Sequence, residues 1–184
     1  EYYRLPLEKR TERTPPNVDK VYYTDSNAAM ISALLFASEI LDKETLKETA
    51  IKTADYILNH CKEWNYFCHY NDGQRKLPGI LSDQVSMLRM LIDVYEHTGE
   101  KHYFKEAELL AQFLLDIIWD KSNGGFWDKR QGEDDFGELK RRVKPFLENS
   151  IAADCFTRLY NHTLNELYQK TAEGCLSLFA ESYS

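Results

Sequence analysis

The chain has 184 residues, 43% hydrophobic and 29% charged, enough for one globular core that buries roughly 70% of the unfolded surface. Its formal net charge is −7 and no helical face gathers the basic residues, which argues against nucleic-acid binding. No apolar run approaches the about 20 residues of a membrane span and no signal-peptide pattern opens the chain, so we expect a soluble, cytoplasmic protein.

Residues 1–20 include a proline-bounded polar run and are expected to form an extended N-terminal segment. One helical domain is predicted over 21–184. It opens with an almost wholly apolar helix, and two later helices share this character and a polar start. The three helices align through Asn27, Asp83 and Asn149.

A second helix is predicted behind each of these. The second helices align through Ala50, Ala107 and Ala172, at nearly the same intervals as the first helices. They keep polar stripes at helical spacing, as in Lys105, Glu108 and Gln112, and are therefore expected to face water. The first helices are apolar nearly all round and are predicted to form an inner layer. Their expected ranges are 27–41, 83–97 and 149–162.

The inner and outer helices alternate with short and long connections, and the long ones are 62–81 and 121–147. This pattern predicts an all-α fold, an α/α toroid of about three hairpins that forms an incomplete ring. The two long connections resemble each other, with Phe67 and His69 opposite Phe126 and Asp128, and a Gly-Gly-aromatic hairpin is predicted in the second. We expect both connections and the starts of the inner helices to share one rim, where any pocket should lie.

The chain also resembles a known family, from about Leu7 to its end. The resemblance rests on an ordered series of residues: Arg10, Arg13, Pro16, Asp19, Lys20, Asn27, Asp83, Gly124, Gly125, Phe126 and Asn149. These look like the C-terminal helical part of the thioredoxin-domain-containing proteins that include a spermatogenesis-associated thioredoxin-like member. In that family the helical part is similar to six-hairpin glycosidase and N-acylglucosamine 2-epimerase toroids. This chain departs from the family pattern at Ser26, where a tryptophan is usual, and it lacks the thioredoxin-like domain.

The resemblance implies a carbohydrate-active or sugar-binding domain, because such toroids need acid/base groups facing a groove with aromatic walls. The candidate catalytic residues are Asp83, Glu148 and His69. The candidate substrate-binding residues are Asp25, Asn27, Tyr70, Arg89, Trp127, Asp128 and Asn149. The alternative function is a non-catalytic helical scaffold that binds a thioredoxin-like domain or another protein.

Structural roles compete with these assignments. Ser26, Ser82 and Asn149 stand at helix starts, and we favour helix capping over ligand binding for them. His69 and Trp127 have loop packing as their alternative. Arg89 lies on one face of its helix with Ser86 and Asp93; an intrahelical Arg89–Asp93 pair is favoured over the lining of a central cavity.

The remaining polar groups suggest no cofactor. The intervals between the four cysteines, at positions 61, 68, 155 and 175, match neither a redox pair nor a zinc ribbon, so buried thiols and no metal are expected. The segment 132–144, with its basic cluster, is interpreted as a solvated loop. An open half-ring should expose apolar side chains at its ends, with Ile31, Leu35, Phe156 and Leu159 as candidates. We therefore expect closure by a homodimer or by a missing part of a larger parent protein.

Overall fold

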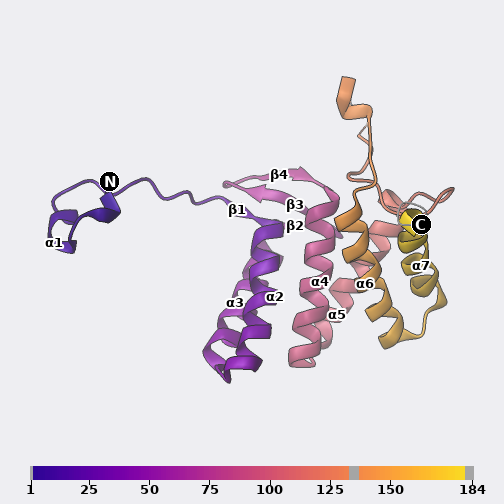
Figure 1. Ribbon diagram of the computed structural model, residues 1–184, viewed down its shortest axis with the longest axis horizontal. Helices are drawn as coiled ribbons and strands as arrows, with labels where there is room; N and C mark the ends of the chain where they lie inside the picture. The colour runs from indigo at the N-terminus through magenta and orange to yellow at the C-terminus, as the bar shows by residue number, and fades with distance from the viewer. Residues whose placement is uncertain (1, 133–136, 181–184) are drawn as a thin grey trace.

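A computed structural model describes residues 2–132 and 137–180. Its N-terminal part contains a 3₁₀ turn, η1 (Tyr2–Arg4), and a single helical turn, α1 (Leu7–Arg10). In Figure 1 this part and the irregular stretch behind it run away from the helical body on the side of α2. The short strand β1 begins at Tyr22, and the first helix of the body begins at Thr24.

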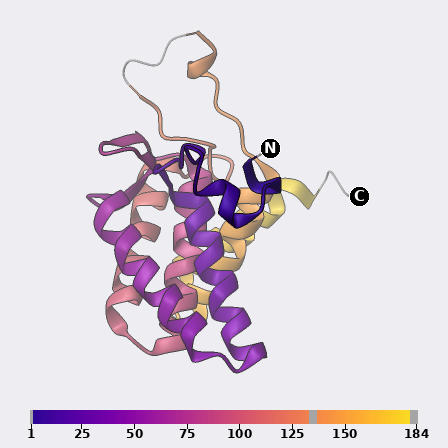
Figure 2. The same cartoon turned by 90° about the vertical axis from the view of Figure 1, so that its left-hand side faces the viewer.

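Three helical hairpins form the body, as the sequence predicts. The inner helices are α2 (Thr24–Leu41), α4 (Leu81–Thr98) and α6 (Phe146–Thr163). The outer helices are α3 (Glu44–Cys61), α5 (Lys101–Phe113) with its π-helical extension η2 (Leu114–Ile118), and α7 (Glu166–Ala180). The inner helices stand side by side in the order α2, α4, α6, and each packs on its own outer partner (Figure 1). Figure 2 shows the same body from the side of α2 and α3.

The short turn inside each hairpin follows from one residue in the left-handed conformation. Asp42, Gly99 and Leu164 end the inner helices with φ of 50°, 74° and 57°. Each donates its backbone N–H to the carbonyl four positions earlier, which closes the last turn. The chain therefore reverses at once, and the next helix lies antiparallel to the first.

Burial confirms the inner and outer layers. In α4, Met87, Leu88 and Leu91 are fully buried, whereas Lys105 and Gln112 of α5 face solvent. The expectation about the open ends is wrong in detail. Ile31, Leu35, Phe156 and Leu159 are all buried, because they face the neighbouring inner and outer helices. The exposed apolar side chains of α2 lie on its other face.

A small sheet, which the sequence pattern does not predict, covers the rim end of the body. It consists of β1 (Tyr22–Tyr23), β2 (Lys62–Glu63), β3 (Tyr66–Asn71) and β4 (Arg75–Pro78). The central strand β3 pairs antiparallel with the other three. In the described part of the second long connection, for which the sequence predicts a hairpin, an isolated antiparallel bridge joins Trp119 to Phe126 around the Gly-Gly turn, and a second one joins Lys129 to Ile80.

Two buried amides tie the long connections to the inner helices. The Gln84 side chain accepts from the Phe67 N–H at 2.8 Å and donates to the Phe67 carbonyl at 2.9 Å. Asn149 does the same with Phe126, at 2.7 and 3.0 Å. Each amide also donates to the carbonyl four positions earlier, that of Ile80 or Pro145. We call this arrangement the amide clamp.

The amide clamp corrects the predicted register. Asn27, Gln84 and Asn149 are each the fourth residue of their helix, so Gln84 and not Asp83 is the counterpart of the two asparagines. With Gln84 in this place, the intervals along the inner helices equal those between the aligned alanines of the outer helices. Asp83 instead corresponds to Ser26 and Glu148. The predicted register differs because Ser82, Asp83 and Gln84 are all polar.

The capping roles are also wrong. The residues before the inner helices are Tyr23, Ile80 and Pro145, and none of them caps its helix with a side chain. Ser26, Ser82 and Asn149 lie inside the helices instead. The first backbone N–H of α4, that of Leu81, is instead bonded by the second long connection: it donates to the Asp128 carbonyl at 2.8 Å.

Charged residues link α4 to α6 away from the rim. Arg158 of α6 donates to Asp93 at 2.7 Å and to Glu96 at 2.6 Å, and Arg89 lies 4.0 Å from Asp154. The predicted Arg89–Asp93 intrahelical pair is therefore wrong, because both side chains find partners on the adjacent helix. Burial raises the pKa of Glu96, but its bonds from Arg158 and His162 outweigh that effect and hold the pKa below its ordinary value.

The basic cluster near residue 140 is only partly solvated. Arg142 and Lys144 each lie 4.7 Å from the Trp127 ring, and Lys144 pairs with Asp120 at 2.7 Å. Part of the predicted loop, residues 133–136, lies outside the described residues. All four cysteines are buried with free thiols, as expected. None of the described helices is long and apolar enough to cross a membrane.

Candidate functional site

A buried carboxylate and a histidine form the centre of the candidate site. Asp83 is fully buried in the first turn of α4, and the His69 Nδ1 lies 3.1 and 3.2 Å from its two carboxylate oxygens. His69 stands on β3 and remains partly exposed. Since Nδ1 faces Asp83, the carboxylate fixes the imidazole ring and leaves Nε2 as the nitrogen that can exchange a proton with a ligand.

Two anchors hold β3 in place for this contact. The Thr24 hydroxyl donates to the Cys68 carbonyl at 2.5 Å, which ties β3 to the start of α2. The Gln84 clamp on Phe67 ties the same strand to the start of α4. Phe67 and Cys68 are buried, and the residue that follows them, His69, is brought to the starts of both inner helices.

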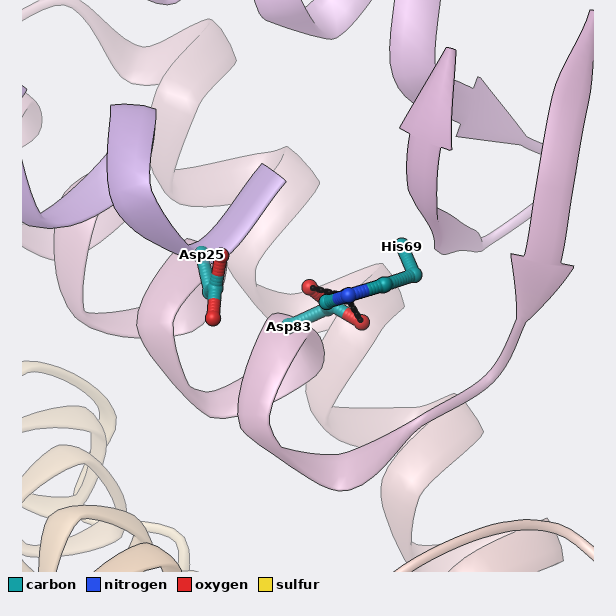
Figure 3. Close-up of side chains that lie close together, drawn as sticks. All are labelled: Asp25, His69 and Asp83. Carbon is teal, nitrogen blue, oxygen red and sulfur yellow. Dashed lines mark hydrogen bonds and ion pairs between the residues drawn. The ribbon is translucent and has the colours of Figure 1, made fainter. Parts of the chain in front are cut away.

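Asp25 completes a group of three titratable side chains. One donor atom from each of Asp25, His69 and Asp83 lies within 4.8 Å of the others. Figure 3 shows the side chains converging from α2, β3 and α4. The Asp25 carboxylate accepts from the backbone N–H of Ser26 at 2.6 Å, which fixes its orientation. We call these three residues the rim triad.

Burial shifts the protonation of Asp83. Desolvation raises its pKa to about 6, although the contact with His69 opposes the rise; the neighbouring Asp25 carboxylate adds to it by like-charge repulsion. Near neutral pH both protonation states of Asp83 are therefore accessible. A group that titrates in this range is suited to acid/base chemistry.

Aromatic rings stand beside the rim triad. The Tyr23 ring centre lies 5.9 Å from that of His69 and 6.0 Å from that of Tyr70, and Tyr70 lies 6.1 Å from His69. Tyr23 is more than one-third exposed. Rings placed in this way can pack against the apolar face of a ligand such as a sugar.

The structure thus brings together four of the predicted site residues, Asp25, His69, Tyr70 and Asp83. Glu148 occupies the equivalent position on α6, half-buried, and makes no hydrogen bond or ion pair within the described part of the chain. Arg89 lies about 9 Å further along α4 than Asp83 and faces Asp154. It belongs to the contact between α4 and α6.

The other predicted binding residues have structural partners. The ring of Trp127 is covered by Arg142 and Lys144. The Asp128 carboxylate accepts from the Val143 N–H at 3.1 Å, and Asn149 is buried in its amide clamp. Asn27 donates to the Tyr23 carbonyl at 2.7 Å and remains partly exposed.

Sequence reasoning missed Tyr23 and Gln84. Requiring equal intervals in the inner and outer helices would have identified Gln84, since only that residue matches the intervals between Ala50, Ala107 and Ala172. For Tyr23 no comparable signal exists, because its place beside His69 depends on the pairing of β1 with β3.

The rim triad also has the donor types of a metal site. Two carboxylates and an imidazole are common ligands of divalent ions such as Zn²⁺ and Mn²⁺. Among the described residues it is the one group of three or more side chains with such a geometry. An ion there would compete with the bond between Asp83 and the His69 Nδ1.

No family model matches the chain. In sequence it is 24% identical over 193 residues to spermatogenesis-associated protein 20 of Rattus norvegicus, covering 95% of this chain and 24% of that protein. This similarity confirms the resemblance inferred from the residue series. The chain spans about a quarter of that relative's length.

The similar solved structures are α/α toroids. One is a GH76 α-mannanase of Bacteroides thetaiotaomicron, with a TM-score of 0.73 and 16% identity over 92% of this chain and 47% of that one. Another is the cellobiose 2-epimerase of Spirochaeta thermophila, with a TM-score of 0.70 and 13% identity over 86% of this chain and 43% of that one. A D-mannose isomerase is also similar, with a TM-score of 0.69 and 16% identity over 89% of this chain and 46% of that one. The chain spans less than half of each. At these identities the likeness establishes the fold alone. The chain has an α/α toroid fold, of which it forms three hairpins.

Proposed function

We propose that the rim triad binds a sugar and exchanges a proton with it. His69 would act as the acid/base group through Nε2, and Asp25 would offer a second carboxylate to the ligand. Asp83 is fully buried and contacts His69, so its role is to position and charge-balance the imidazole. The observation that carries the proposal is this buried Asp83–His69 contact beside Asp25 and two tyrosines.

The geometry favours proton transfer at a sugar carbon over hydrolysis. Inverting hydrolysis needs two carboxyl groups about 6.5–9.5 Å apart, with room for a water molecule between them. The donor atoms of Asp25 and Asp83 lie within 4.8 Å. A retaining mechanism needs a carboxylate that attacks the sugar, and Asp83 has no exposed surface for such an attack. A single positioned imidazole can instead remove a proton beside a sugar carbonyl and return it.

The similar solved proteins support a sugar as the ligand. They include a mannanase, a cellobiose 2-epimerase and a D-mannose isomerase, three proteins that act on sugars through one fold. Fold alone does not fix chemistry. The acid/base and aromatic groups at the rim of this chain are the independent support.

Binding is tested by NMR titration of the protein with mannose, glucose, cellobiose and an α-mannoside. We expect saturable shifts of the His69 ring signals with one sugar class, and loss of binding by about tenfold or more in His69→Ala. His102→Ala is the matched control, because His102 is an exposed histidine on α5 away from the rim. Unchanged spectra with every sugar at about 50 mM, a concentration well above a dissociation constant of about 1 mM, would contradict sugar binding.

Chemistry is tested in heavy water with the sugar that binds. Proton transfer predicts deuterium at the carbon beside the carbonyl, and hydrolysis predicts release of a reducing end. We expect deuterium incorporation that His69→Ala abolishes. If only reducing ends form, the hydrolytic alternative replaces proton transfer.

A second candidate function is a helical scaffold that binds another protein. The exposed apolar face of α2, with Met30 60% and Ile40 69% exposed, favours it. Sugar titrations that leave the rim signals unchanged, together with capture of a protein partner by α2, would support the scaffold instead.

A further inference from the structure

The turn between β2 and β3 holds a tryptophan against two local preferences. Trp64 and Asn65 form its two-residue loop, and Trp64 has a φ of 58°, in the left-handed region. Gly and Asn are the residues that such a position favours, whereas a bulky side chain strains the backbone there. Trp64 is also 85% exposed, more than any other large hydrophobic residue in the described part of the chain.

No contact within the protein compensates for this placement. Within the described residues the Trp64 ring makes no aromatic or cation–π contact, unlike Trp119 and Trp127. A residue that opposes local preference without a compensating contact is expected at a functional site. The role of Trp64 should therefore lie outside the packing of the chain.

A groove of about 330 Å³ opens beside the turn. It lies between β2–β3 and the C-terminal end of α5 with the adjoining η2. Its volume is at the lower end of the range of about 300–1,000 Å³ that small-molecule sites have. Its lining residues include Trp64, Tyr66, Gln112, Asp116, Ile117 and Arg130. We call it the Trp64 groove.

Apolar groups line one part of the Trp64 groove. The Tyr66 ring packs on Phe113, with ring centres 4.7 Å apart, and the Arg130 guanidinium carbon lies 5.6 Å from the Tyr66 ring centre. Ile117 of η2 is 50% exposed. Tyr66 is therefore held in place by its neighbours, whereas the Trp64 ring is open to a ligand.

Three planar polar groups line the rest of the groove. The Gln112 Nε2 donates to the Asp116 carboxylate at 2.9 Å, which orients both side chains. A carboxamide, a carboxylate and a guanidinium each present two N or O atoms side by side, an arrangement that suits hydroxyl groups on neighbouring carbons. Asp116 and Arg130 balance each other in charge, so the groove favours a neutral ligand over a phosphate or a cation.

We infer that the Trp64 groove is a second sugar-binding site, one that takes a neutral oligosaccharide. A sugar ring has an apolar C–H face and a border of hydroxyl groups. Its apolar face stacks on the Trp64 ring, and its hydroxyl groups bond to Gln112, Asp116 and Arg130. This occupant uses both kinds of group that line the groove.

The Trp64 groove is separate from the rim triad. β3 carries both Tyr66 and His69, and successive side chains of a strand point to opposite faces. These two side chains therefore lie on opposite faces of β3, about 10 Å apart along the strand. The inference does not depend on the chemistry of the rim triad.

The probes are cellotetraose and an α-mannotetraose, each at up to about 10 mM. Binding is followed by the ¹⁵N signal of the Trp64 indole N–H and, in variants without this indole, by the Gln112 side-chain amide. We expect saturable shifts with one of the two sugars. Trp64→Ala should weaken binding by about tenfold or more, because the stacking surface is lost. Trp64→Tyr keeps a ring and should bind within about threefold of the unmodified chain.

Two control variants make the result specific to this groove. Phe36→Ala removes an aromatic ring of α2 that is 65% exposed, and it should leave binding unchanged. His69→Ala should also leave the Trp64 shifts unchanged, so that failure of the rim triad and failure of this site are distinguishable. Trp64→Gly should not lower the urea midpoint, because Gly adopts a φ of 58° without strain.

Three results would overturn the inference. They are an unchanged Trp64 signal with both sugars, equal binding by Trp64→Ala, and a lowered urea midpoint in Trp64→Gly, which would give the indole a structural role. A dimer in light scattering that Trp64→Ala abolishes would assign the groove to a second copy of the chain and would overturn it too.

Discussion

At the scale of single residues, the buried Asp83 lowers the stability of the fold at higher pH, and it also positions His69 at the rim. Burial raises its pKa to about 6, so the folded protein binds the Asp83 proton more tightly than the unfolded chain does. Its favourable contribution is complete below the ordinary aspartate pKa and is lost as the pH rises through the folded value. The contact with His69 recovers part of this loss.

Asp83→Asn should therefore flatten the pH dependence of stability. Between about pH 4 and pH 6 the free energy of unfolding of the unmodified chain should fall relative to that of the variant, on the order of 2 kcal/mol. Urea denaturation at four pH values measures the difference. Asp116→Asn, at an exposed position, serves as the control, and its free energy of unfolding should differ from that of the unmodified chain by the same amount at every pH. If the difference in free energy of unfolding between Asp83→Asn and the unmodified chain were also the same at every pH, Asp83 would have an ordinary pKa.

At the scale of the elements, the amide clamps join each long connection to the next inner helix. The N–H and carbonyl of Phe126 are buried with it and would be left without partners if Asn149 were removed. Gly125 contributes as well, because its φ of 75° and its contact with Leu178 leave no space for a side chain. The same logic applies to Gln84 and Phe67.

Asn149→Leu should lower the free energy of unfolding by about 2–4 kcal/mol, because two buried backbone groups lose their partners. Gln84→Leu should cost a similar amount. Asn27→Leu is the matched comparison and should cost less than about 1 kcal/mol, since its amide bonds only the Tyr23 carbonyl. Chemical denaturation of the three variants measures these values. Equal losses at all three positions would mean that the clamped segments contribute nothing specific.

At the scale of the whole molecule, the half-ring has two unlike edges. The α2 edge exposes Met30, Phe36 and Ile40, whereas α6 exposes polar residues along its middle, such as Thr157 and Asn161, and the apolar Phe146 and Leu147 at its start. A soluble monomer rarely exposes a large contiguous apolar patch, so the α2 edge is the one that a partner should cover.

The double substitution Met30→Glu and Phe36→Glu should leave stability within about 0.5 kcal/mol, because both side chains already face solvent. It should also reduce the binding of a hydrophobic dye. Leu35→Glu, on the buried face of the same helix, should instead unfold the chain. Thermal unfolding and dye fluorescence distinguish the two faces. A large loss of stability in the double variant would place Met30 and Phe36 in the core.

Local pattern determined the helices and their layers. Helical periodicity and the contrast between polar-striped and apolar helices were enough to predict three hairpins, with inner and outer members, because these signals lie within single helices. The residue series indicated the toroid fold, and the shared rim placed Asp25, His69 and Asp83 at one end of the body.

Only the tertiary structure decided which polar residues at that end meet. Successive residues of a helix point about 100° apart, so Asp83 turns to His69 while Gln84 turns to Phe67, and one polar run serves two purposes. Partners that lie a whole irregular connection away along the chain leave no periodic signal. For the same reason the sequence could not show that Gln84 and Asn149 hold the backbone of their connections while Asn27, with the same amide, stands beside an open cavity.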